Sequence, residues 1–483
     1  MTIGRDVIGN GGTAADAAVA MYFAMTVTLP SRVGMAGGGV CIAHNSGLGV
    51  QKGAPFVDVI QFLPDPATPD LPQLAGPRAM AVMHARHGSA RWALLLNDAE
   101  RMARLGNGVS RAFAVDLAAA SDFVSANPDL RAAFSNRSKI LAREGDVITL
   151  SELSGLISGL RRQGAGYLYS GAFTNRFVEA ANSVGSPITV QQLRGSLPVV
   201  VPPLAIPYGD SMAYFSPPPG GGGVLSAQMW GMMTDVENYG GASQVERVHM
   251  MAEAGQRAFA ERGGWMRGDD TDGAALVAER QMERLMAGYR SSQHSPAAES
   301  AATPLPATSN PFTAGFVVAD RWSSAVACSF TMNGLFGDGR MVPGTGVILP
   351  KAAVLGANNL SAAIIANEFN GTLYFAGTAS GGLAAPAALT RVMLESEANG
   401  NNLEAAMAAP RVVNVGVPDV TYYEPSLDPA TLAALRQRGH SLAAESGVGL
   451  VNALICPGGL RNETITCQVA RDKRGHGLAI LVQ

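Results

Sequence analysis

The chain has 483 residues, which is enough for one large core or for two to three ordinary domains. Hydrophobic residues make up 47% of the chain and charged residues only 15%, and 57 glycines indicate many tight turns. The formal net charge of −3 leaves no basic surface of the kind that nucleic acid requires, so we expect no nucleic-acid partner.

Near the N-terminus, the apolar run from Ala17 to Leu29 has the look of a signal peptide. The spacing Thr13-x-x-Asp16 is a capping box, however, and Pro30 ends the run, so the pattern predicts a buried helix over residues 13–29. The run is also too short to span a bilayer. We therefore expect no export signal, no membrane partner and a cytoplasmic location.

The cysteines and histidines give no metal-binding pattern. The four cysteines form no C-x-x-C pair, and Cys41 and Cys328, which lie in apolar strands, are predicted to be buried thiols. The seven histidines are scattered and form no H-E-x-x-H motif. The sequence predicts no metal and no cofactor.

The first 290 residues contain a glycine run at 34–39 before a strand over 40–44, and residues 76–290 are predicted to be mainly helical. Pro217 to Gly223 is a loop rich in proline and glycine, and Glu253 and Arg257, four residues apart, are placed to pair on one helix face. The polar, proline-containing segment that follows, residues 289–312, is predicted to be a linker.

A predicted β-hairpin follows this linker. Thr313 stands directly before a strand over 316–319, and a second strand covers 325–331. Cleavage between Phe312 and Thr313 would free an α-amine beside the threonine's own hydroxyl, and that amine can act as the general base for an N-terminal nucleophile. The alternative is structural, because threonine is common at strand starts.

Further along, strands are predicted over 362–366 and 372–376, and a glycine-rich turn over 377–382 leads into a helix over 383–394. Backbone N–H groups at such a helix start suit an oxyanion hole. Ser380 in this turn is a rival nucleophile, but no G-x-S-x-G motif surrounds it. A helix over 428–439 has Asp428 at its N-cap.

The stretch from Thr313 to Asn333 resembles, without a gap, the start of the small subunit of γ-glutamyltranspeptidases, which are N-terminal-nucleophile hydrolases. Thr313 matches the nucleophile, and Thr331 and Asn333 match the T-x-N that follows it. Matches continue in order from Gly9 to about Ala479, at the glycine pair Gly381-Gly382, at the A-P-R ending in Arg411, at the A-x-D-x-R of residues 470–474 and at the H-x-x-x-E-A of residues 249–254.

The resemblance implies an α+β fold, a four-layer αββα sandwich, in a single domain over 1–483. It divides the chain into a large-subunit part, 1–312, and a small-subunit part, 313–483. It also implies that Thr313 forms an acyl-enzyme with a small-molecule amide or peptide, as in glutathione metabolism. Thr331 would then orient Thr313, the N–H groups of Gly381 and Gly382 would hold the oxyanion, and Asn333 would contact the substrate.

Three departures from the family concern the reading of glutamate. Ile60 stands where the family has the arginine for the α-carboxylate, Leu355 where it has the acid for the amine, and Asn358-Asn359 where it has a serine pair. A buried charge left unpaired costs roughly 2–5 kcal/mol. The substitutions therefore favour a less charged acyl group, with Asn358 and Asn359 as donors. They also leave open a silent, unprocessed family member that serves as a binding or scaffold protein.

Overall fold

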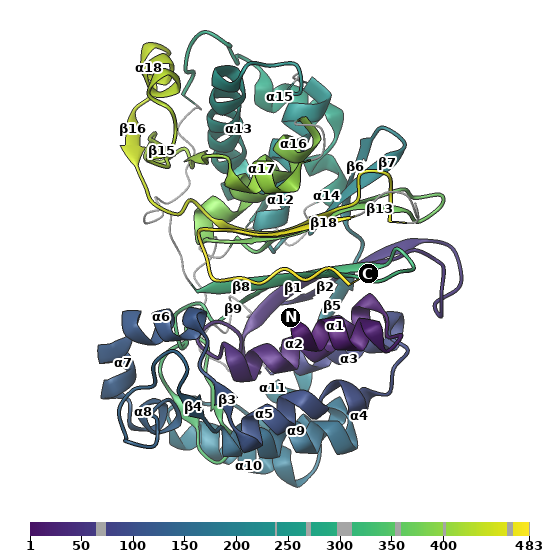
Figure 1. The fold of residues 1–483 in the computed structure, drawn as a ribbon, viewed down its shortest axis with the longest axis vertical. Coiled ribbons are helices and arrows are strands. Elements are labelled where there is room, and N and C mark those ends of the chain that lie inside the picture. Colours follow the sequence, from purple (N-terminus) through teal and green to yellow (C-terminus); the bar gives the residue numbers. More distant parts are fainter. Residues whose placement is uncertain are drawn as a thin grey trace.

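The computed structural model describes residues 1–63, 74–236, 239–266, 272–296, 312–352, 359–398, 402–460 and 467–482. Two β-sheets lie face to face between two layers of helices (Figure 1), which confirms the αββα sandwich expected from the sequence. The first sheet has the strand order β5 (Val199–Val201), β2 (Phe56–Phe62), β1 (Gly38–Asn45), β9 (Ala325–Thr331) and β8 (Thr313–Ala319). The second has the order β18 (Gln468–Arg471), β17 (Leu450–Ile455), β13 (Leu373–Ser380), β12 (Ser361–Ala366), β7 (Ser211–Phe215) and β6 (Leu204–Tyr208).

The helices over the first sheet come from the N-terminal part of the chain. They are α1 (Thr2–Gly9), α2 (Ala14–Thr28), α3 (Ala75–His87), α4 (Trp92–Leu95), α5 (Asn97–Leu105), α6 (Arg111–Ala119), α7 (Ser121–Ala126), α8 (Pro128–Ala133), α9 (Ser151–Gln163), the 3-10 helix η1 (Ala165–Leu168), α10 (Ala172–Ser183) and α11 (Val190–Gly195). Two small ribbons, β3 (Asn107–Gly108) with β4 (Val147–Ile148) and β10 (Met341–Val342) with β11 (Val347–Ile348), lie on this side (Figure 1).

The second sheet is covered by the other helices. They are α12 (Gly222–Gly231), η2 (Met232–Val236), α13 (Gln244–Trp265), α14 (Gly273–Leu276), α15 (Glu279–Met286), the 3-10 helix η3 (Gly382–Ala384), α16 (Ala385–Ala398), α17 (Leu403–Ala408) and α18 (Pro429–Gln437). A small sheet of β14 (Val412–Asn414), β15 (Thr421–Tyr423) and β16 (Leu442–Ala444) lies beside α13 and α18. One hydrophobic cluster fills each gap between layers, and the cluster between the two sheets consists mainly of alanine and valine-sized side chains.

The two sheets approach closely at the start of β8. A Cβ on Gly315 would lie 2.6 Å from the Cys328 carbonyl oxygen and 2.9 Å from Thr378 Cγ2 on the other sheet, so only glycine fits there. The side chain of Asn452 on β17 donates to the Gly315 carbonyl oxygen at 3.1 Å. The first residues of β8 are therefore fixed between both sheets, which sets the position of Thr313.

Some predictions about elements need correction. Residues 76–290 are mainly helical, as predicted, but they also contain the short strands β5, β6 and β7, because short apolar runs do not distinguish a strand from a buried helix. Residues 377–380, predicted as a turn, belong to β13, where β12 and β17 pair with them on either side. The capping box is confirmed, since Thr13 accepts from the Asp16 N–H and the Asp16 side chain accepts from the Thr13 N–H. Within the described ranges, no helix combines the length and apolar character needed to cross a membrane.

The prediction of buried thiols at Cys41 and Cys328 is wrong, because the two residues form a disulfide. They are directly opposed in the antiparallel ladder of β1 and β9, with their Cα atoms 4.1 Å apart. Their separation of 287 residues gave no sign of this pairing, which depends on strand register. Cys456 and Cys467 form a second disulfide.

Candidate active site

Thr313 is the first residue of β8 and lies opposite Thr331, the last residue of β9. Its side chain is almost completely buried, with 1% of the residue exposed. The backbone N–H of Gly381 donates to Thr313 Oγ1 at 3.1 Å. A strand of one sheet thus presents a hydroxyl to a backbone donor at the end of a strand of the other sheet.

The turn at Gly381 and Gly382 requires glycine at both positions. Their φ angles are +124° and +59°, and a Cβ on Gly381 would lie 2.8 Å from the Gly449 Cα atom. Gly382 begins η3, which leads directly into α16. The Gly381 N–H, fixed at a helix start and donating to the Thr313 hydroxyl, is suited to stabilise negative charge on oxygen at this place.

Thr331 and Asn333 form a small network beside Thr313. Asn333 donates from its backbone N–H to Thr331 Oγ1 at 2.9 Å, and its Nδ2 donates to the Lys351 carbonyl oxygen at 2.9 Å. Asn333 has a φ of +57°, which asparagine tolerates better than most residues. These bonds fix the chain after β9, and they use the side-chain amide that we expected to contact substrate.

Asn359 lies at the same end of the second sheet. Extending the register of β12 and β13, in which Ser361 faces Ala379, places Asn359 alongside Gly381. The residue is 2% exposed, and its Nδ2 has no hydrogen-bond partner within the described part of the chain. Its Oδ1 is 3.1 Å from the position of a Cβ on Gly221, in the proline-rich loop. An unpaired buried donor beside the Gly381 turn is a candidate contact for a substrate oxygen.

The sequence suggested three other positions for substrate recognition, Asn358, Leu355 and Ile60. Asn358 and Leu355 lie outside the described residues. Ile60, which stands where the family has its arginine, is fully buried in the core between the first sheet and its helices, opposite Cys41, so its side chain is not available to a substrate. Side chains alternate along a strand, and its neighbour Gln61 instead donates to the Pro217 carbonyl oxygen at 2.8 Å.

Arg32 is a site residue that the sequence did not reveal. Its Nη1 donates to the Thr313 carbonyl oxygen at 3.3 Å, and its Nε and Nη2 donate to the two carboxylate oxygens of Asp116 at 2.7 and 2.6 Å. Ser31 also donates to Asp116, at 2.6 Å. The bidentate contact with Asp116 holds the Arg32 guanidinium against the first peptide of β8. A single arginine after a proline carries no sequence signal for that role.

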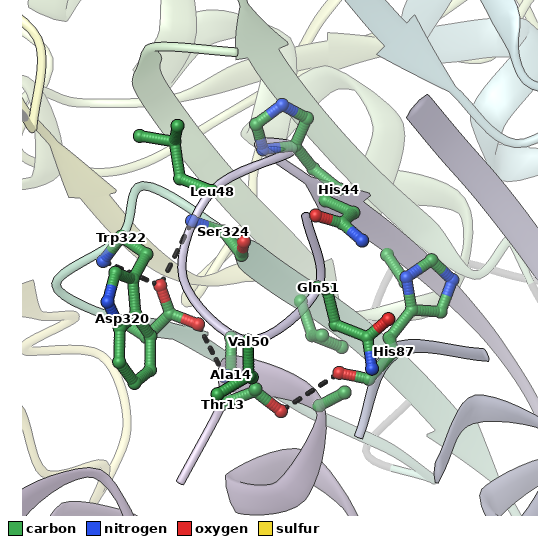
Figure 2. Close-up of a pocket in the computed structure, with 14 residues that line it drawn as sticks. Thr13, Ala14, His44, Leu48, Val50, Gln51, His87, Asp320, Trp322 and Ser324 are labelled. Carbon is green, nitrogen blue, oxygen red and sulfur yellow. Dashed lines mark hydrogen bonds between the residues drawn. The ribbon is translucent and has the colours of Figure 1, made fainter. Parts of the chain in front are cut away.

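Two cavities lie away from Thr313. One, of about 10 Å³, has room for roughly one water molecule and lies at the opposite end of β8, where Asp320 joins the hairpin to the start of α2 (Figure 2). Asp320 accepts from the N–H of Ala14 at 2.9 Å, and burial raises its pKa to about 6. The other, of about 330 Å³, is bounded by residues 30–35, α8, the start of α9 and β10–β11. Neither lining includes Thr313 or Gly381.

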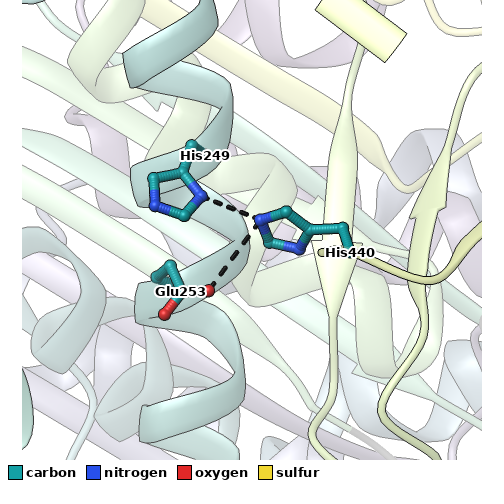
Figure 3. A group of neighbouring side chains, drawn as sticks. All are labelled: His249, Glu253 and His440. Atoms are coloured by element: carbon teal, nitrogen blue, oxygen red, sulfur yellow. Dashed lines mark hydrogen bonds and ion pairs between the residues drawn. The ribbon is translucent and has the colours of Figure 1, made fainter. Parts of the chain in front are cut away.

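Two of the scattered histidines, His249 and His440, meet with Glu253 in a buried cluster (Figure 3). Their potential ligand atoms all lie within 4.8 Å of one another. His249 Nδ1 and His440 Nε2 are 2.8 Å apart, His249 Nε2 is 2.9 Å from the Arg290 carbonyl oxygen, and His440 Nδ1 is 3.1 Å from Thr421 Oγ1. Each ring nitrogen of the two histidines therefore has a hydrogen-bond partner, and hydrogen bonding alone accounts for the cluster.

A family model and individual relatives agree with this architecture. The family model described as Gamma-glutamyltranspeptidase matches residues 1–353 and 357–482, so the chain belongs to the γ-glutamyltranspeptidase family. The glutathione hydrolase proenzyme of Escherichia coli strain K12 is 23% identical, over 94% of this chain and 86% of that protein. The glutathione hydrolase 5 proenzyme of Rattus norvegicus is 26% identical, over 91% of this chain and 84% of that protein.

Among solved structures, a cephalosporin acylase from Bacillus halodurans has the same fold. The alignment covers 100% of this chain and 94% of that chain, with a TM-score of 0.81 and 19% sequence identity. With the family, this fold identifies the chain as an amide hydrolase or acyltransferase of the N-terminal-nucleophile type, which acts on γ-glutamyl or related acyl amides.

Proposed function

We propose that Thr313 is the nucleophile and that the chain cleaves itself between Phe312 and Thr313. The observation that supports this most directly is the 3.1 Å hydrogen bond from the Gly381 N–H to Thr313 Oγ1. In cleavage, Oγ1 attacks the Phe312 carbonyl carbon, and the peptide nitrogen becomes the amine of Thr313 as an ester forms. Water then hydrolyses the ester and leaves a large piece, 1–312, and a small piece, 313–483.

In turnover, the new amine takes the proton from Oγ1 as the oxygen attacks the carbonyl carbon of a substrate amide. The N–H groups of Gly381 and Gly382 stabilise the oxyanion, and the amine then gives its proton to the leaving nitrogen. Water or a second amine attacks the acyl-enzyme and frees Thr313. Arg32, which binds the Thr313 carbonyl oxygen, holds the nucleophile in place.

The acyl group is proposed to carry less charge than a γ-glutamyl group. Ile60 replaces the family's arginine and carries no charge for an α-carboxylate, while Asn359 Nδ2, which has no hydrogen-bond partner in the described part of the chain, offers one neutral donor. Neither of these two residues pairs a charge of a zwitterion, and a zwitterion whose charges stay unpaired loses its water without compensation. We therefore expect p-nitroanilides of acyl groups with one charge or none to be better substrates than γ-glutamyl p-nitroanilide, by at least about tenfold in kcat/KM. The highest kcat/KM for the γ-glutamyl compound would refute this preference.

The cleavage test must account for the disulfide between Cys41 and Cys328, which lie in different pieces. Denaturing mass spectrometry without reductant should show a single species, heavier than the uncleaved chain by one water. After reduction the same sample should give two pieces that separate at the Phe312–Thr313 bond. Thr313→Ala should remain one uncleaved chain under both conditions and show no amidase activity, while its unfolding temperature stays close to that of the wild type.

Two results would contradict the assignment. An intact wild-type chain after reduction, in fresh and aged samples alike, favours the silent binding or scaffold protein. Cleavage of Thr313→Ala at the same bond shows that another group acts, and Ser380→Ala then tests the rival nucleophile.

The cytoplasmic location stays a prediction, and the two disulfides count against it. Such bonds persist in oxidising compartments and are rare where glutathione and thioredoxin keep thiols reduced. We propose an oxidising compartment. Protein alkylated in intact cells should contain no free thiol, whereas alkylation of all four cysteines would restore the cytoplasmic location.

A further inference from the structure

A network of buried charges lies behind the Gly381 turn, and its members come from separate parts of the sequence. Arg411 Nη2 is 2.7 Å from Asp472 Oδ2, and Arg474 Nε is 2.5 Å from Glu424 Oε1. Arg411, Asp472 and Glu424 are each less than 5% exposed. Two arginines face two carboxylates, so the network carries no net charge. Buried ion pairs add little net stability to a folded protein. The role of this network is therefore better judged from the groups that it hydrogen-bonds.

The network binds the backbone of a loop, residues 447–449, and of the start of β17, which follows it. Arg411 Nη1 donates to the Gly449 carbonyl oxygen at 2.8 Å, and the Val448 N–H donates to Glu424 Oε1 at 3.1 Å. The Val451 N–H donates to Asp472 Oδ2 at 3.0 Å. The loop contains two glycines with positive φ, and these bonds fix its position together with the packing of Val448, which is buried in the core.

This loop is in turn the support of the Gly381 turn. In the ladder of β13 and β17, Ser380 faces Leu450, which places Gly449 next to Gly381. A Cβ on Gly381 would lie 2.8 Å from the Gly449 Cα, and a Cβ on Gly449 would lie 2.6 Å from the Ala388 Cβ on α16. Gly449 therefore fills the space between the turn and the helix, and a shift of Gly449 moves the Gly381 N–H.

We propose that Arg411 and Asp472 are positioning residues for the reaction at Thr313, acting through Gly449 on the Gly381 N–H. The contacts form a continuous series. Asp472 pairs with Arg411, and Arg411 donates to the Gly449 carbonyl oxygen. Gly449 packs against Gly381, whose N–H donates to Thr313 Oγ1. Neither residue touches the substrate. The role of the network in catalysis rests on the proposed function of Thr313, whereas its role in holding the turn does not.

The test variant is Asp472→Asn, which keeps the shape of the side chain and removes the charge that holds Arg411. The chain offers a matched control in Glu253→Gln, since Glu253 and Arg257 form another buried pair, with 2.6 Å between Glu253 Oε2 and Arg257 Nη1. Each variant removes one buried carboxylate that pairs with arginine, Asp472 with both Arg411 and Arg474 and Glu253 with Arg257, so both should lower the unfolding temperature. Asp472→Glu serves as the conservative variant.

Two readouts separate positioning from stability and from the proposed function. Hydrogen exchange followed by mass spectrometry on a peptide containing residues 380–384 needs no activity, and Asp472→Asn should speed exchange there at least about tenfold, while Glu253→Gln leaves it unchanged. Steady-state kinetics on the folded, cleaved protein should show kcat lower by at least about tenfold for Asp472→Asn, with KM within about twofold of the wild type and partial recovery in Asp472→Glu.

Unchanged exchange at residues 380–384 in Asp472→Asn overturns the proposal, and so does an equal loss of kcat in Glu253→Gln. If the wild type shows no Thr313-dependent activity, the function proposed for Thr313 fails, and the exchange result still decides whether the network holds the turn. Should Asp472→Asn not fold, Gly449→Ala provides the same two readouts, because its added methyl group pushes against Ala388. Wild-type exchange and kcat in Gly449→Ala would then refute the proposal.

Discussion

Arg411 and Asp472 form one buried ion pair, and Glu253 and Arg257 on α13 form another of similar length and burial. Beyond the pairs themselves the two regions differ. The first pair donates to the backbone beside Gly381, one hydrogen bond from Thr313. The second leads to His294 and, through it, to Asp419, away from the strand ends where Thr313 lies.

The difference shows that burial and charge are poor guides to function by themselves. Glu253 has a lowered pKa, because His294 and Arg257 outweigh the effect of its burial, and Asp472 has a lowered pKa because Arg411 and backbone N–H donors do the same. Perturbed ionisation is thus common to both regions. What distinguishes them is the chain of contacts that reaches the nucleophile.

The largest effect is expected in the Gly381 turn, from Gly381→Ala. The added Cβ collides with Gly449 and moves the donor to Thr313, so we expect kcat to fall by about 100-fold or more. The matched control is Gly371→Ala in the turn before β13, where φ is +67° and a Cβ would lie 2.3 Å from the Ser46 carbonyl oxygen. It should lose stability but keep kcat, and an equal fall of kcat in both variants contradicts the comparison.

The histidines beside α13 should make the stability of the protein depend on pH. Burial, with the charges of His294 and His249, lowers the pKa of His440 to about 4, so the folded protein keeps this ring neutral where the unfolded chain protonates it. Stability therefore falls as the pH drops from about 6.5 towards 4, by about 2 kcal/mol at pH 5 from His440 alone. The pKa of His294 is raised, because Glu253 and Asp419 outweigh the effect of its burial. The stability that protonated His294 contributes is therefore fully present below pH 6.5 and does not change as the pH falls further.

Urea unfolding between pH 7 and 5 measures this effect. His440→Gln should flatten the loss of stability relative to the wild type, and His476→Gln, at an exposed histidine, should not. The kcat of the folded wild-type protein should not follow the His440 titration. A loss of stability as steep in His440→Gln as in the wild type argues against a neutral buried His440.

The smallest effect is expected at Asn359, where a buried polar group has no hydrogen-bond partner among the described residues. Removing the unpaired Asn359 Nδ2 with Asn359→Ala should leave the stability of the free protein unchanged or higher, while KM rises about tenfold, or about 1.4 kcal/mol. Asn333→Ala provides the contrast, since it removes the bond to the Lys351 carbonyl and should cost about 1–3 kcal/mol of stability. A KM unchanged in Asn359→Ala removes Asn359 from the substrate site.

Local patterns in the sequence determined much of the fold. The hairpin is confirmed with Thr313 at the start of β8 and with β9 at residues 325–331, and Asp428 caps α18 as its spacing predicted. The Glu253–Arg257 pair is confirmed at the expected helical spacing. These features depend on residues a few positions apart, so alternation, capping and turn chemistry are sufficient to define them. The four layers of the fold were predicted from the family motifs, which occur in the same order along this chain.

Only the tertiary structure decided which distant residues meet. Strand register joined Cys41 to Cys328 and turned Ile60 into the core, although both were read differently from the sequence. The packing of the two sheets placed the Gly381 N–H against Thr313 Oγ1, and the loop before β17 connects Arg411 to the Gly381 turn. A one-residue change of register reverses the face of every side chain in a strand, and no local pattern reports the register between strands that are far apart in the chain.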